Sequence, residues 1–199
     1  AAAEAAPEGG SRMQLEWMRS QTDLVSSLIL SQRGRFSEAF EAADRAHAFA
    51  VLGGRVERFI IDQLTLAMFV ARWASGSLLA ASEIMEQVRS RPLGLLQSTG
   101  FVEGASAVLA IGEGRWRDAA LQAERAVARY TRCDPFGVLA VFTGVLASAQ
   151  AALGDRAASR RSVLAAEIAR PGTAQTLRGV VRILTLEARH WNGEFDVVD

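Results

Sequence analysis

A glycine turn that recurs five times at nearly equal spacing is the feature that most constrains how this chain folds. The recurring glycines are Gly34, Gly76, Gly114, Gly154 and Gly193. Their successive separations are 42, 38, 40 and 39 residues. Self-similarity at a period of this length indicates that one supersecondary unit is repeated along the chain.

Each complete unit combines two helical patterns. After Gly114, for example, Trp116, Ala119, Ala123 and Ala126 recur at helical spacing with charged residues between them, which places one apolar stripe on a helix. A second long helical pattern precedes each glycine. Glycine suits the residue just past a helix end because that position often requires positive φ. We therefore predict units made of a helix, a glycine turn and a second helix.

The chain is predicted to be all-α, a right-handed superhelix (α-solenoid) of about four and a half antiparallel two-helix repeats in a single domain. The predicted helices span residues 11–32, 36–52, 55–74, 77–90, 93–112, 115–132, 135–153, 155–169 and 173–191. The predicted units span about residues 11–54, 55–91, 92–133, 134–171 and 172–199. Asp134 and Pro135 are expected to open the fourth unit as N-cap and first helical residue. The incomplete fifth unit suggests a fragment of a larger protein.

Two further positions repeat with the glycine. Small residues follow it by five places and are expected to permit close helix packing: Ala39, Ala81, Ala119 and Ser159. Large apolar residues follow it by two places and are expected to fill the space between units: Phe36, Leu78, Trp116 and Phe195. Arg156 interrupts this second pattern, so the fourth unit is expected to be looser or to use the arginine's stem.

Composition excludes several classes of function. Half of the 199 residues are hydrophobic and 22 basic residues balance 22 acidic ones, so no basic surface for nucleic acid or for an acidic membrane is expected. The single cysteine, Cys133, cannot form an internal disulfide, and no signal peptide is visible, so the cytoplasm is the expected location. The uncharged stretch 135–154 is interpreted as a buried helix and not as a membrane span.

No catalytic set or metal-ligand cluster is visible in the sequence, and no cofactor is expected. His47 and His190 lie in the first and last units, and Cys133 adds no ligand spacing. Cys133 stands at an expected helix start, where amides could stabilise a thiolate, but Asp134 opposes this. We expect an ordinary thiol. The segment 112–114 is interpreted as a turn because it lacks the lysine and preceding strand of a phosphate loop.

At Gly34, Phe36 and Ala39, and again at Gly114, Trp116 and Ala119, the chain resembles tetratricopeptide repeats. Its period is nearer 40 than the usual 34 residues, which implies longer helices. The elongated, alanine- and arginine-rich units also resemble the sensor domain of large ATP-binding LuxR-type bacterial regulators, the group that includes the maltose-operon activator. That resemblance covers residues 12–199 and implies a domain that receives an inducer or a partner protein.

In tetratricopeptide folds the first helix of each unit lines a concave groove, which here is expected to be apolar. The predicted groove residues are Gln63, Leu66, Val70, Trp73, Phe101, Val108, Ile111, Val141, Ser148, Glu187 and His190. Alternatively, the longer helices curl tightly and these side chains pack on one another.

Three functions are therefore considered. The first is a non-catalytic regulatory sensor domain of a LuxR-family regulator, which binds a small-molecule inducer or a partner protein in the groove, with self-association possible. The second is an adaptor that only scaffolds a partner protein. The third, an α-helical enzyme with a site between repeats, has no visible acid, base or nucleophile to support it.

Overall fold

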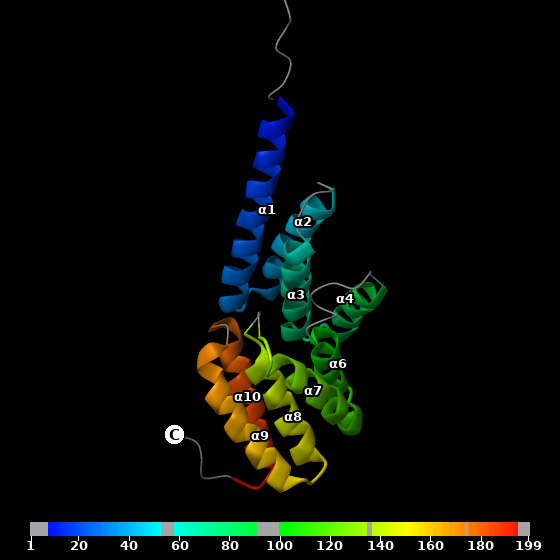
Figure 1. Cartoon of the computed structure of the whole chain (residues 1–199), viewed down its shortest axis with the longest axis vertical. Helices are drawn as coiled ribbons and strands as arrows, with labels where there is room; N and C mark the ends of the chain where they lie inside the picture. The colour runs from blue at the N-terminus through cyan, green and yellow to red at the C-terminus, as the bar shows by residue number, and fades with distance from the viewer. Residues whose placement is uncertain (1–7, 53–57, 91–99, 135–136, 174, 195–199) are drawn as a thin grey trace, which may run out of the picture. The chain divides into compact units, whose positions relative to one another are not determined.

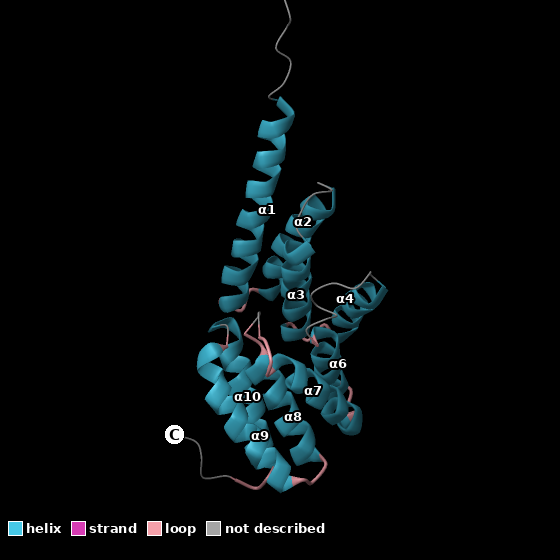
Figure 2. Ribbon diagram, viewed as in Figure 1, coloured by secondary structure: helices cyan, strands magenta, loops and turns pink. Residues whose placement is uncertain are grey.

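The computed structural model describes residues 8–52, 58–90, 100–134, 137–173 and 175–194, and these residues are helical with no strand (Figures 1 and 2). The helices are α1 (Glu8–Gln32), α2 (Phe36–Leu52), α3 (Arg58–Ala74), α4 (Leu78–Ser90), α6 (Phe101–Gly112), α7 (Trp116–Tyr130), α8 (Leu139–Ala152), α9 (Arg156–Ala169) and α10 (Gln175–Trp191). A short 3-10 helix, η1 (Arg170–Gly172), follows α9. The all-α prediction is confirmed.

All five recurring glycines adopt the left-handed conformation after a helix, and the first four lie between two described helices. Their φ angles are 72° at Gly34, 79° at Gly76, 70° at Gly114, 84° at Gly154 and 79° at Gly193. The residue after each glycine donates its amide to the carbonyl five residues before it, at 2.8–3.0 Å: Arg35 to Leu30, Ser77 to Arg72, Arg115 to Ala110, Asp155 to Gln150 and Glu194 to Arg189. This is the Schellman ending, which requires a residue that tolerates positive φ. The predicted turns are thus confirmed.

The small positions that follow these turns lie in the interior of the protein. Ala39, Ala81, Ala119 and Ser159 are fully buried, as close helix packing requires. The large residues two places after the glycines are partly buried where the structure describes them, at Phe36, Leu78 and Trp116. Phe195 lies outside the described residues. Arg156 is exposed.

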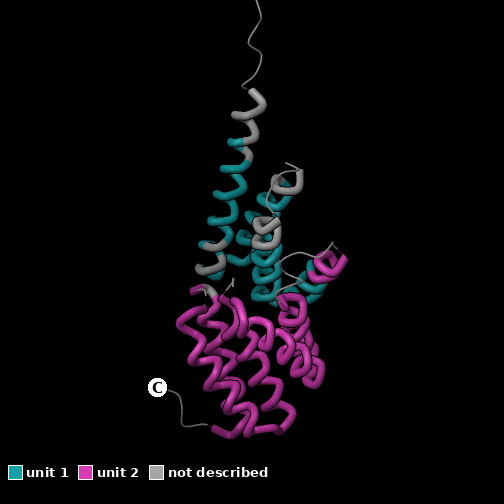
Figure 3. Tube along the Cα trace, viewed as in Figure 1, with its two compact units in different colours: residues 1–84 teal, residues 85–199 magenta. Residues whose placement is uncertain are grey.

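The chain divides into two compact units, residues 1–84 and 85–199, and α4 contains the boundary (Figure 3). In the first unit, α1, α2 and α3 pack against one another. Asp23 of α1 forms an ion pair with Arg45 of α2 at 3.1 Å. The guanidinium of Arg72 in α3 lies 3.5 Å from the ring centre of Phe40 in α2, so a cation–π contact supplements the apolar packing of this unit.

In the second unit each helix from α6 to α9 packs against the next one described, and α8 also contacts α6 and α10 (Figure 1). Helix α8 lies at the centre, and every residue from Ala140 to Ala149 is buried. Most of the uncharged stretch of sequence thus forms a core helix, Leu139–Ala152. No described helix is long and apolar enough to cross a membrane.

Glycine permits the close approach of α8 to its neighbours. A Cβ at Gly104 of α6 would overlap the ring of Phe142 in α8, and a Cβ at Gly144 of α8 would lie 3.1 Å from the Cβ of Leu184 in α10. The Phe142 ring also contacts Tyr130 of α7, with the ring centres 5.3 Å apart. A side chain at either glycine would force the neighbouring helix or its side chains to move.

The start of the fourth repeat differs from the prediction. Helix α8 begins at Leu139 and not at residue 135, because Gly137 has a φ of 64°, which a right-handed helix does not accommodate. The N-cap residue is Val138 and not Asp134. The carboxylate oxygens of Asp134 nevertheless accept hydrogen bonds from the amides of Val138 and Leu139, each at 2.9 Å. The predicted N-cap and the predicted helix boundary were therefore both wrong, although the Asp134 carboxylate does accept amides at the start of this helix. Pro135 lies outside the described residues.

A buried polar chain links three helices of the second unit. Ser159 of α9 donates its hydroxyl to the carbonyl oxygen of Ala147 in α8 at 3.0 Å. Asn192, directly after α10, donates its side-chain amide to the Ser159 oxygen at 3.0 Å. Both side chains are almost fully buried. Ser159 thus fills the small position of the fourth unit and supplies hydrogen bonds that alanine cannot.

Candidate functional site

The structure buries much of the predicted groove in the second unit. Phe101, Val108, Val141 and Ser148 are at most 4% exposed, and Ser148 donates its hydroxyl to the carbonyl oxygen of Leu184 at 2.9 Å. These side chains fill the interior between α6, α8 and α10. For these four positions the alternative interpretation, in which the inward residues pack on one another, fits the structure.

The other predicted groove residues are more accessible. Ile111 and Glu187 are partly buried and His190 is exposed in the second unit. Leu66, Val70 and Trp73 are partly buried on α3 of the first unit. The side chain of Gln63 lies outside the described residues. That these residues line a groove stays a prediction.

Sequence reasoning missed a surface at the turn end of the second unit, which we call the tryptophan surface: Trp116, Leu153 and Trp191. The indole rings of Trp116 and Trp191 lie 6.4 Å apart, tilted by 58°. Trp191 is 51% exposed and Leu153 is 45% exposed. All three residues lie next to glycine turns. Trp116 begins α7 after the third turn, Leu153 directly precedes the glycine of the fourth turn, and Trp191 lies two residues before the glycine of the fifth.

A depression of about 380 Å³ adjoins this surface. Its lining combines Trp116 and Leu153 with the polar start of α7, namely Gly114, Arg115, Arg117 and Asp118. Apolar contact area beside a few polar groups is typical of sites that bind ligands or peptides. The depression therefore extends the tryptophan surface to a candidate binding site.

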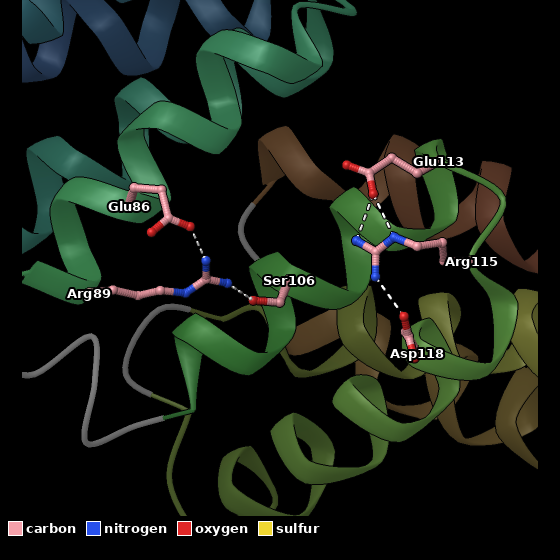
Figure 4. Close-up of polar contacts among 6 residues, drawn as sticks. All are labelled: Glu86, Arg89, Ser106, Glu113, Arg115 and Asp118. Atoms are coloured by element: carbon pink, nitrogen blue, oxygen red, sulfur yellow. Dashed lines mark hydrogen bonds and ion pairs between the residues drawn. The ribbon is translucent and has the colours of Figure 1, made fainter.

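Ion pairs hold the polar side of this depression in place. The Arg115 guanidinium lies between two carboxylates, donating to Asp118 at 2.7 Å and to Glu113 at 2.6 Å (Figure 4). These hydrogen bonds, with Asp118 first, raise the pKa of Arg115 above its ordinary value. Arg117 has no carboxylate within ion-pair distance among the described residues. Arg115 is thus already paired within the protein, whereas Arg117 is the arginine of this site that is available to an incoming group.

A similar polar arrangement ties α4 to α6 in the second unit. Arg89 forms an ion pair with Glu86 and donates a hydrogen bond to the hydroxyl of Ser106 at 2.7 Å (Figure 4). Ser106 in turn donates to the carbonyl oxygen of Val102 at 2.6 Å. Because each member already has a partner here, we interpret this arrangement as structural.

Among the residues that the structure describes, no three His, Cys, Asp or Glu side chains are grouped so that they could hold a metal ion. Cys133 is an exposed free thiol. His47 is partly buried in the first unit, and His190 is exposed in the second.

No family model, curated protein or solved structure matches this chain. The resemblances to tetratricopeptide repeats and to LuxR-type regulators therefore rest on the sequence motifs alone.

Proposed function

We propose that this chain is a tetratricopeptide-like binding domain, in which the tryptophan surface anchors an inducer or partner protein, and that it serves as the regulatory domain of a LuxR-type regulator. The observation that carries the binding proposal is the pair of neighbouring indole rings with Leu153 beside an open depression. Tryptophan is enriched among the residues that dominate binding energy at interfaces. The half-exposed ring of Trp191 offers contact area at little cost in side-chain entropy.

The repeats support a binding role in a second way. The glycine turns at Gly34, Gly114 and Gly154 each join two helices that pack against one another, and in repeat proteins such stacking creates extended surfaces for ligands. In the regulatory proposal, a ligand that fits one arrangement of the helices better than another shifts the population of a switch elsewhere in the protein.

Binding is tested with a panel of aromatic small molecules and amphipathic peptides, screened for an increase in the midpoint of thermal unfolding. Trp191→Ala is expected to weaken a hit by about fivefold or more, which corresponds to roughly 1 kcal/mol. Trp17→Ala is the matched control, because Trp17 is 52% exposed on α1 of the first unit. It should leave the affinity unchanged.

Two results would contradict the binding proposal: a panel without any hit, or hits whose affinity is the same in Trp191→Ala and in the unaltered chain.

The regulatory assignment has a separate test in the gene that encodes the chain. An ATP-binding module encoded before these repeats and a helix-turn-helix encoded after them would support it. An unrelated catalytic domain fused to the repeats would refute it.

A further inference from the structure

We propose that the solvent-facing side of α9 is a docking surface for an amphipathic helix of a partner protein, one that carries acidic residues on both sides of its apolar stripe. We call this surface the α9 face and define it by Ala157, Arg160, Arg161, Leu164 and Ile168, all of which are exposed. It shares no residue with the tryptophan surface, so it goes beyond the proposed function.

An apolar stripe runs along the middle of the α9 face. Helix α9 packs against α8 and α10, and Val163 and Ala166 lie on its buried side. At about 100° per residue, Ala157, Leu164 and Ile168 fall within about 40° of one another on the opposite side of the helix. Leu164 is 60% exposed and Ile168 is 72% exposed. The two large side chains therefore project directly away from the core.

The preceding repeat shows that this exposure does not depend on which helix comes next. Leu164 and Ile168 lie ten and fourteen residues after the fourth glycine, and the corresponding residues after the third glycine are Glu124 and Ala128 of α7. Both are exposed, although α8, α9 and α10 follow α7 in the same unit. A repeat that stacks on α9 as the fourth stacks on the third therefore leaves the α9 face open.

The same two positions differ between the fourth repeat and the first three. Ten residues after the glycine, the first three repeats carry exposed acidic residues: Asp44, Glu86 and Glu124. Fourteen residues after the glycine, they carry exposed small residues: Ala48, Ser90 and Ala128. Only the fourth repeat places leucine and isoleucine there. A position that is polar or small in three repeats is thus large and apolar in the fourth, and neighbouring exposed apolar side chains mark interaction sites.

Arginine flanks the apolar stripe on both sides. Arg160 and Arg161 are successive residues, and the helical rotation between them places them on opposite sides of Leu164. Arg160 donates its Nε to Glu194 at 2.6 Å, and its side chain is 60% exposed. Arg161 is exposed and forms no ion pair with any residue that the structure describes. Arg161 is therefore the charge of this face that is open to a partner.

The exposed side of α9 carries no acidic residue. Glu167, the one acid in this helix, is partly buried and forms an ion pair with Arg189 of α10 at 2.6 Å. Asp155 directly before the helix caps it by accepting the amide of Ala158 at 3.0 Å. Helix α7, by contrast, exposes Asp118 and Glu124 among its arginines. The α9 face is therefore apolar in the middle and positively charged along its edges.

This charge pattern selects the occupant. A second copy docked through the same face would bring arginine against arginine, and like charges across an interface oppose binding. Binding to an acidic membrane scales with the apolar area that is inserted, and here Leu164 and Ile168 are the large apolar side chains available. An acidic amphipathic helix satisfies both features, because its apolar side covers these two residues while its carboxylates pair with arginine.

The probe is a labelled peptide of about 20 residues, a length at which an isolated helix begins to be stable. It carries leucine along one side and glutamate on both flanks, and a comparison peptide has lysine in place of every glutamate. Fluorescence anisotropy with the full chain measures binding. The glutamate peptide is expected to bind at least about tenfold more tightly than the lysine peptide, and added salt should weaken it.

Leu164→Glu should weaken binding of the glutamate peptide by about tenfold or more, because it places a carboxylate in the apolar contact. The fold should be retained, since acid occupies this position in the other repeats, and circular dichroism checks this. Arg161→Glu should weaken binding by about threefold or more and reduce its salt dependence. Leu79→Glu is the matched control: Leu79 is 84% exposed on α4, so this variant should bind as the unaltered chain does.

Three results with the peptides would each overturn the proposal: no binding of the glutamate peptide up to about 1 mM, equal affinity for the two peptides, or unchanged affinity in Leu164→Glu. A fourth comes from vesicles of phosphatidylserine and phosphatidylcholine. If the chain binds these vesicles through Leu164 and does not bind the glutamate peptide, the occupant is a membrane surface and not a partner helix.

Discussion

Replacing Gly104 by alanine should test whether the second unit owes its close packing to glycine. The same change at an open helical glycine provides the reference, and Gly179 of α10 is such a position. Alanine stabilises a helix interior by about 0.5–1 kcal/mol relative to glycine. At Gly179, where the new methyl group meets nothing, we expect this full gain.

At Gly104 the methyl group would overlap the ring of Phe142, which is 3% exposed and packed against Tyr130. Overpacking of this kind costs about 1–3 kcal/mol. Subtracting the gain in helix propensity leaves a net destabilisation of up to about 2 kcal/mol. The two alanine variants should therefore differ by about 1–3 kcal/mol, the overpacking cost alone. Gly144→Ala should fall between them, because its methyl group would meet Leu184 at 3.1 Å.

Urea denaturation followed by circular dichroism measures these differences, and the slope of each transition shows whether the unfolding behaviour is shared. A second variant identifies the cause: Phe142→Leu should lower the cost of Gly104→Ala, so that the two changes together cost less than the sum of each alone. Equal stability of the Gly104 and Gly179 variants, or strict additivity with Phe142→Leu, would refute the close approach of α6 and α8 at this position.

Three further substitutions test other parts of the fold by the same denaturation assay. Ala119→Leu should overpack the fully buried small position of the third repeat and cost about 1–3 kcal/mol; an unchanged midpoint would mean that Ala119 faces no neighbour. Asp134→Ala should cost about 0.5–2 kcal/mol, because the amide of Val138 loses its hydrogen-bond acceptor. Asp134→Asn should retain much of the stability of the unaltered chain. Ser159→Ala should cost about 1–3 kcal/mol, since it leaves the buried amide of Asn192 without its acceptor; a neutral result would show that this hydrogen bond contributes nothing net.

The repeat could be recognised from the sequence because its signals are local. A helix that ends at Gly114 or Gly154 requires a residue tolerant of positive φ, and the small residue that follows must fit between helices. Both requirements appear as residue type at fixed spacing. The start of α8 was predicted four residues too early, because a proline after Asp134 suggested an immediate helix start. The positive φ of Gly137 instead prevents a right-handed helix from forming before Leu139.

The candidate site could not be predicted in the same way. The positions of Gly104 and Gly144 in the sequence do not reveal how closely α6, α8 and α10 approach. That distance decides whether Phe101 and Val141 line a groove or fill a core. The contact between Trp116 and Trp191 joins residues from different repeats, so it depends on the stacking of whole helices and not on any local pattern.

The order of helix contacts in the second unit bears on how this part of the chain acquires its structure. Every pair of contacting helices from α6 to α10 is adjacent in the described order or separated by one helix. Such low contact order favours rapid folding, because only short loops must close before packing begins. Since synthesis proceeds from the N-terminus, α6 and α7 can pair before α9 and α10 have left the ribosome. The hydrogen bond from Asn192 to Ser159 can form only when α10 has packed, so this last step completes the buried polar chain.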